Sequence, residues 1–382
     1  TAQTKSAKAL QVWLEPITML AAIAVATTRI GLIATGSSTY TEPFNLARQF
    51  ASIDHISQGR AGWNIVTSWM AAAARNFGDT GQLSHSERYA LAEEHVQIVK
   101  GLWDSWADDT IIDDRQNAVF ANTNRIRPID FKGEYFNVAG PLNLPRGPQG
   151  HPVLVQAGSS EDGRGFAARH AEAVFTAHIE KTTAQAFYSD MKKRVAAEGR
   201  RPDQVLILPG LCPTIASTEA EAKRLLLELS NYADVEIAVK YLGTWFGGHD
   251  FSHLPLDRPL TVADFPDLLN IETSKSRTEM VINLIKREEI TLRELLARFA
   301  HIGGHYLFAG TAEQVADLIE DWFLDGAADG FNLMPPLLPT MLDIFIDEVV
   351  PLLQRRGLFR TEYQGTTLRE HYGLERPASV FV

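Results

Sequence analysis

Short apolar runs alternate with helix-like segments along this chain, and this alternation restricts its possible folds more than any other feature. The runs begin at Ile30, Ala61, Pro152, Ala173, Val205 and Gly330. They are apolar on both faces, as strands of a parallel sheet covered by helices are. Strands that alternate with helices predict an α/β fold. A doubly wound sheet is the competing fold, but the Gly-rich turn that normally follows its first strand is missing.

Residues 61–66 are predicted to form a strand, and the clearest helix signal in the sequence follows them at Ser84. Ser84 with Glu87 three residues later is a capping box, which predicts a helix that begins at His85. Tyr89 then lies one turn further on the same face. A basic residue at a helix N-terminus is disfavoured unless an anion binds there. The spacing leaves two interpretations: a phosphate site, or an exposed first-turn histidine with a packed tyrosine.

A second strand-to-helix junction carries Ser159 and Ser160. Backbone N–H groups at such a junction can bind an anion, and simple N-capping by serine is the alternative. Residues 158–164 come close to a P-loop motif, but the Lys-Ser/Thr pair is missing and two acidic residues would repel a triphosphate. The junction therefore suits a single phosphate group better than a nucleoside triphosphate.

Thr35 and Asn64 are polar residues that we expect at the ends of two neighbouring strands. The Asn64 amide can hydrogen-bond the polar edge of a ligand ring. Strand-end capping for Thr35 and turn formation by Asn64 are the alternatives.

Composition and missing motifs exclude several classes of protein. The formal net charge of −11 argues against a nucleic-acid partner. The single cysteine, Cys212, excludes an internal disulfide, so we expect a cytoplasmic protein. The apolar residues 17–34 are interrupted by Thr-Thr-Arg and read as helix, turn and strand rather than as a membrane span; no basic region precedes them, so we expect no signal peptide.

Metal, nucleophile and dinucleotide motifs are also missing from the sequence. Two histidine pairs have a spacing of four residues, but neither belongs to an H-E-x-x-H motif, so we expect no metal site. There is no Gly-x-Ser-x-Gly nucleophile motif, and Cys212 lies in an apolar run. There is no Gly-x-Gly-x-x-Gly either, so we expect no built-in NADH reductase domain.

Several long segments resemble the bacterial-luciferase-like flavin monooxygenases. The branch with nitrilotriacetate, EDTA and dibenzothiophene-sulfone monooxygenases is the closer match, and the resemblance covers nearly the whole chain. The matching segments are GWNIVTS with NFG and H-x-x-x-Y, SSTYTEPFNLARQFASIDHISQGR, PQGHPVLVQAGSSEDGR, GAADGFNLMPPLLP and RRGLFRTEYQGTTLREHYGL.

The resemblance implies a (β/α)8 TIM-type barrel that forms a single domain over residues 1–382. Insertions are expected at residues 67–151 and 214–329, and a C-terminal arm at residues 356–382. Only six candidate strands are visible and such a barrel needs eight, so the first two strands of the family are expected to be absent from this sequence. The native polypeptide is then expected to begin before Thr1.

The resemblance further implies a monooxygenase that uses reduced FMN, supplied by a separate NADH-dependent flavin reductase, together with dioxygen. The substrate is expected to be a small organic molecule, with C–N or C–S cleavage as a possible outcome, and the protein is expected to be a homo-oligomer. The expected FMN-binding residues are Thr35 and Asn64 at the ring, and His85, Tyr89, Ser159 and Ser160 at the phosphate. No residue is assigned as catalytic acid or base.

Two other functions stay open on the same fold: a flavin- or deazaflavin-dependent dehydrogenase, and a flavin-binding barrel without catalysis. Residues 244–276 are rich in Gly, His, Asp and Pro, with scattered aromatic residues. We expect this stretch to act as a lid that hides its aromatic side chains when ligands bind. A static surface loop is the alternative.

Overall fold

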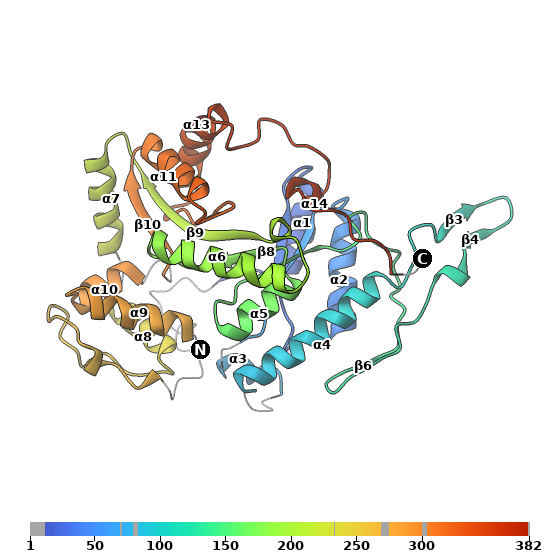
Figure 1. Ribbon diagram of the computed structural model, residues 1–382, viewed down its shortest axis with the longest axis horizontal. Helices are drawn as coiled ribbons and strands as arrows, with labels where there is room; N and C mark the ends of the chain where they lie inside the picture. Colours follow the sequence, from blue (N-terminus) through green and yellow to red (C-terminus); the bar gives the residue numbers. More distant parts are fainter. Residues whose placement is uncertain are drawn as a thin grey trace. The chain divides into compact units, whose positions relative to one another are not determined.

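The chain folds into two compact units. Their helices and strands are labelled in Figure 1. The structure, a computed structural model, describes residues 12–68, 71–78, 83–232, 234–268, 275–299 and 304–380. The first unit comprises residues 12–157, 165–173 and 362–382, and the second comprises residues 158–164 and 174–361 together with residues 1–11, which are not described. The sequence-based prediction of a single barrel domain with insertions and a C-terminal arm stays a prediction.

The first unit is built on three parallel strands, β1 (Leu32–Ser37), β2 (Ala61–Val66) and β7 (Val153–Gln156). Buried side chains of the strands and of α2 and α4, such as Trp63, Phe50 and Val99, form its core. Its helices are α1 (Pro16–Ala26), α2 (Pro43–Ile56), α3 (Ala71–Ala74), α4 (His85–Trp103), most of α5 (Glu161–His170), α14 (Leu368–His371) and the 3₁₀ helix η2 (Thr123–Arg125).

Two small antiparallel hairpins complete this unit, β3 (Ile111–Asp114) with β4 (Val119–Ala121) and β5 (Phe131–Lys132) with β6 (Asn137–Val138). The second hairpin is tied to α4 by the Glu94 carboxylate. It accepts backbone N–H bonds from Glu134, Tyr135 and Phe136 at 2.7, 3.0 and 3.2 Å. Three donors on one carboxylate fix the hairpin turn against the helix.

The second unit is also built on parallel strands. Its central strand β9 (Leu206–Ile215) pairs with β10 (Tyr306–Gly310) and with β11 (Asn332–Leu333). Its remaining elements are β8 (Ala173–Thr176), α6 (Lys181–Ala197), η3 (Pro202–Gln204), α7 (Glu219–Asn231), α8 (Val235–Trp245), η4 (Val262–Asp264), α9 (Lys275–Arg287), α10 (Leu292–Phe299), α11 (Ala312–Leu324), α12 (Thr340–Ile344), η6 (Phe345–Val349) and α13 (Val350–Arg355).

The predicted α/β class is confirmed, because the paired central strands of each unit run parallel and alternate with helices. The predicted number of strands in the sheet, six, is too low by one. All six predicted strands are present, and β10 (Tyr306–Gly310) is a seventh strand inside the expected insertion of residues 214–329. None of the described helices is both long enough and apolar enough to span a membrane.

The expected lid segment does not expose its aromatic residues. Trp245, Phe246, Phe251 and Phe265 are buried in a hydrophobic cluster with side chains of α8, α9 and α10. The Phe251 ring lies 5.4 Å from Phe246 and 5.1 Å from Phe265, measured between ring centroids. These rings form a hydrophobic core in this structure, and the interpretation of residues 244–276 as a lid stays a prediction. Residues 269–274 of the segment lie outside the described residues.

Candidate active site

Thr35 and Asn64 face each other across the first two strands. They are register partners in the β1–β2 ladder, and Asn64 Nδ2 donates a hydrogen bond of 3.0 Å to Thr35 Oγ1. Asn64 Oδ1 is buried and has no partner among the described residues. A buried amide oxygen without a donor is uncommon and marks a place where a ligand N–H can complete the pairing. A flavin ring carries such a donor at its polar edge, so the residue pair fits the ring.

The prediction that Thr35 and Asn64 end their strands is wrong. Each strand runs two residues further, and the ladder closes with Ser37 opposite Val66. The physical reason is that Gly36 and Ile65 continue the buried face of the sheet, so the ladder extends past Thr35 and Asn64.

His85 and Tyr89 occupy the first turns of α4, as predicted. The capping box is present: Ser84 Oγ accepts from Glu87 N at 3.3 Å, and Glu87 Oε2 accepts from Ser84 N at 2.8 Å. The two rings lie 5.0 Å apart, which confirms that they share one helix face. Tyr89 also contacts Phe166 edge-on at 5.7 Å. A histidine over the positive end of a helix dipole can serve as an anion ligand.

Ser159 and Ser160 lead into α5 in the second unit. Ser160 Oγ accepts a hydrogen bond of 3.2 Å from Gly163 N, so the capping role considered as the alternative is present. Ser159 instead lines a cavity. The assignment of either serine to a phosphate stays a prediction.

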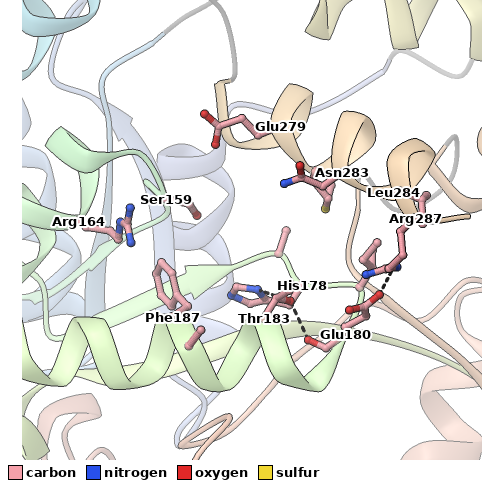
Figure 2. A pocket seen from close by; sticks show the side chains of 14 residues that line it. Ser159, Arg164, His178, Glu180, Thr183, Phe187, Glu279, Asn283, Leu284 and Arg287 are labelled. Carbon is pink, nitrogen blue, oxygen red and sulfur yellow. Dashed lines mark hydrogen bonds and ion pairs between the residues drawn. The ribbon is translucent and has the colours of Figure 1, made fainter. Parts of the chain in front are cut away.

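This cavity of about 380 Å³ lies in the second unit (Figure 2). Its size falls in the range of pockets that hold small organic molecules. It is lined by the start of α5, the loop after β8, the first turns of α6 and one face of α9. The lining residues are Ser159, Arg164, Ala177, His178, Ile179, Glu180, Thr183, Ala186, Phe187, Glu279, Met280, Asn283, Leu284 and Arg287.

His178 is held in the cavity wall by two hydroxyl groups. Thr183 Oγ1 donates to the Glu180 carbonyl at 2.9 Å, so it can only accept from His178 Nδ1 at 3.3 Å. Nδ1 therefore carries the proton, and Nε2 accepts from Thr176 Oγ1 at 3.0 Å. Burial, with a smaller effect of His305, lowers the pKa of His178 to about 4. The imidazole is thus neutral near pH 7.

Charged groups on the cavity rim come from α5, α9 and the loop after β8. Arg287 forms an ion pair with Glu180, and Arg164 Nη1 donates to Asp190 at 2.8 Å. Sequence reasoning missed His178, Glu180, Asn283 and Arg287. Asn283 and Arg287 have a helical spacing of four residues, but no local pattern relates them to His178 and Glu180 about a hundred residues earlier. The length of the expected insertion was the only signal for the two residues of α9.

Comparison with known proteins agrees with this architecture. The profile of the family described as luciferase-like monooxygenase matches residues 2–329. The chain belongs to this family. It is a monooxygenase of the (β/α)8 barrel class, which confirms the family, the enzyme class and the fold predicted from the sequence.

Similar proteins of known activity show which members of the family the chain resembles. It is 48% identical to N-acetyl-S-(2-succino)cysteine monooxygenase of Bacillus subtilis (strain 168), over 96% of this chain and 82% of the relative. It is 47% identical to nitrilotriacetate monooxygenase component A of Aminobacter aminovorans, over 95% and 80%. The solved EDTA monooxygenase of Chelativorans sp. BNC1 superimposes with a TM-score of 0.79 at 38% identity, over 95% and 82%.

Proposed function

We propose that this chain is the oxygenase component of a two-component system that uses reduced FMN. The observation that carries the proposal is the Thr35–Asn64 pair, with one amide oxygen open to a ligand donor. A solved riboflavin lyase, described with modified FMN and riboflavin, superimposes with a TM-score of 0.85 at 33% identity, over 96% of this chain and 80% of that one. Bound reduced flavin supplies the reaction with dioxygen, and the protein supplies position and exclusion of water.

The proposed contacts to FMN follow the family resemblance. Thr35 and Asn64 are assigned to the ring, while His85 and Tyr89 are assigned to the phosphate together with Ser159 and Ser160. The contact between the His85 and Tyr89 rings supports the second assignment, since both side chains lie beside the N-terminus of α4. The substrate is a small organic molecule, oxidised with cleavage of a C–N or C–S bond.

The electrons come from a separate NADH-dependent flavin reductase. The name of the nitrilotriacetate enzyme denotes one component of a system, and a further relative, 46% identical, is named as one of the subunits of pristinamycin IIA synthase. We place both components in the cytoplasm, in keeping with the single cysteine. We further propose that the oxygenase forms a homo-oligomer.

A reconstitution separates this function from its alternatives. The pure protein is mixed with NADH and FMN, with and without a flavin reductase, and a panel of amines, thioethers and sulfones is supplied under ¹⁸O₂. Label in the product only when the reductase is present is the expected result. NADH turnover by the pure protein contradicts the two-component proposal, and product formation without consumption of dioxygen indicates a dehydrogenase. Binding of FMN without any product indicates a non-catalytic barrel.

A further inference from the structure

The hairpin of β3 and β4 exposes apolar side chains from both of its strands. Ile111 and Ile112 of β3 are 40% and 50% exposed, and Val119 and Phe120 of β4 are 42% and 64% exposed. Neighbours in a strand point to opposite faces, so apolar side chains meet solvent on both faces of the hairpin. An isolated two-stranded hairpin is only marginally stable in water, and a contiguous apolar patch of this kind marks a surface that binds another molecule.

The base of the hairpin is fixed to the first unit, so its exposure is not that of a loose loop. Thr110 is fully buried, and its Oγ1 donates to the Ala107 carbonyl at 2.6 Å. Asn122 N donates to the Thr110 carbonyl at 2.9 Å, which joins the two strands where they leave the unit. Figure 1 shows β3 and β4 extending away from α2 and α4 of the same unit. The hairpin is therefore a rooted arm with an apolar outer part.

The charged residues at the end of the hairpin are complementary to themselves. The side chains of Asp113 and Arg115 are 57% and 87% exposed, and the ion pair between them is long at 3.4 Å. An exposed pair of this kind contributes little to stability, so it is readily exchanged for a pair between two molecules. A two-fold axis brings the same surface of both copies together, and Arg115 of one hairpin then faces Asp113 of the other in both directions.

The charge balance favours a second copy of this chain over a membrane as the partner. Residues 110–122 carry two aspartates and one arginine, so the hairpin lacks the basic residues that bind anionic lipids. The whole chain has a net charge of −11, so two copies repel each other overall. The nearly neutral and apolar hairpin is a place where this repulsion is weak.

We propose that the β3–β4 hairpin is a dimerisation arm, which packs against the same hairpin of a second copy of this chain about a two-fold axis. The inference rests on the homo-oligomer of the proposed function and names the surface that forms it. Ile112 and Phe120 supply the apolar centre of the interface, and the exchanged pairs of Asp113 and Arg115 lie at its rim.

Sedimentation velocity of the full chain over a range of concentrations measures the dimer. We expect Phe120→Ser to raise the dissociation constant by about tenfold or more, because a large aromatic side chain is lost from the centre of the interface. Leu227→Ser is the matched control, since Leu227 of α7 is also 64% exposed but lies outside the hairpin. It is expected to leave the dissociation constant unchanged. Circular dichroism and thermal unfolding check that each variant keeps the fold.

Arg115→Asp tests the exchanged ion pairs. It places like charges opposite each other, so we expect it to weaken the dimer at low ionic strength. Added NaCl screens this repulsion. The loss is therefore expected to shrink with salt in Arg115→Asp and to persist in Phe120→Ser.

A cysteine in the hairpin tests direct contact between the two arms. Val119 lies opposite Asp114 in the hairpin, between the two charged positions, so Val119→Cys places one thiol of each copy near the axis. The natural Cys212 is 1% exposed and does not compete. Since a disulfide needs the two Cα atoms within about 7 Å, mild oxidation is expected to link Val119→Cys into a covalent dimer and to leave Leu227→Cys unlinked.

A dimer that persists unchanged in Phe120→Ser and Arg115→Asp overturns the dimerisation arm and supports the homo-oligomer. A chain that stays monomeric at every concentration overturns both, and binding to phosphatidylserine vesicles that is lost in Phe120→Ser then assigns the hairpin to a membrane. Incorporation of ¹⁸O is measured on the same samples. Dimerisation through the hairpin without any oxygen incorporation supports the arm and contradicts the proposed oxygenase function.

Discussion

Buried polar atoms without a partner are the most informative single-residue features of this protein. Asn64 Oδ1 lacks a donor among the described residues, and so does Asp54 Oδ2. The two differ in kind. Asn64 lies beside Thr35, where we place a ligand, whereas Asp54 is held in the first unit by Gln149 Nε2 at 2.7 Å and by Ala61 N at 3.3 Å. The first atom therefore indicates a role in function and the second a role in stability.

His85 is the residue with which to test the phosphate assignment. We expect His85→Ala to weaken FMN binding by on the order of 1.5–3 kcal/mol, because a charge-assisted contact to phosphate is lost. Riboflavin lacks the phosphate and serves as the internal control. Both affinities can be measured from the quenching of flavin fluorescence. A similar loss for both ligands would place the phosphate elsewhere.

Asp54 makes the stability of the protein depend on pH. Burial raises its pKa to about 6, although hydrogen bonds from Gln149 and Ala61 act in the opposite direction. A carboxyl with a raised pKa favours the folded state when protonated, so its contribution is full below about pH 4 and is lost as the pH rises through 6. Asp54→Asn removes this dependence and keeps the Oδ1 acceptor.

We therefore expect Asp54→Asn to gain stability relative to the natural residue as the pH rises, by about 1.4 kcal/mol between pH 5 and pH 8. Urea unfolding at both pH values measures the difference. A difference that is the same at pH 5 and pH 8 would show that Asp54 does not titrate in this range.

At the scale of elements, local sequence motifs predicted several helices and strands correctly. Contacts between residues far apart in the sequence were not predicted. The Ser84–Glu87 capping box correctly placed the start of α4 at His85. The strand Tyr306–Gly310 was not predicted from the sequence. It follows glycines and a histidine pair, and its five residues do not alternate between apolar and polar. Arg287 and Glu180 are more than a hundred residues apart, and only folding joins them. Local patterns cannot report such pairs.

A substitution in the hydrophobic cluster around Phe251 tests the interpretation of residues 244–276 as a lid. Phe251 is fully buried, so Phe251→Ala is expected to cost about 3–5 kcal/mol and to speed amide exchange in α8, α9 and α10. Phe323→Ala is the control, because Phe323 is 46% exposed on α11. A loss below about 1 kcal/mol would instead indicate that the segment opens freely, as a lid does.

For the molecule as a whole, residues 362–380 complete the first unit. Arg369 of α14 pairs with Glu172, and Arg369 Nη2 also donates to the carbonyl of His151 at 3.0 Å. Its side chain is 3% exposed, whereas Arg376 and its partner Asp108 are both more than 40% exposed. Burial decides which of these two ion pairs matters for stability.

We expect Arg369→Met to destabilise the protein by about 3–5 kcal/mol, because the carboxylate of Glu172 is left largely buried without a cation and keeps only the Leu154 N–H as a donor. Arg376→Met is expected to cost less than about 1 kcal/mol. Thermal or denaturant unfolding of both variants measures the contrast. Equal losses would mean that the contacts of the C-terminal segment act through its backbone rather than through these side chains.

The anchoring of Arg369 also has a consequence for biosynthesis. The ribosome makes β1, β2 and β7 early, but Arg369, whose side chain pairs with Glu172, is made about two hundred residues after β7. A nascent or prematurely terminated polypeptide thus carries the strands with Thr35 and Asn64 without the contacts that complete their unit. Such products are expected to be recognised by chaperones and proteases, so that chains translated past Arg369 accumulate in preference to shorter ones.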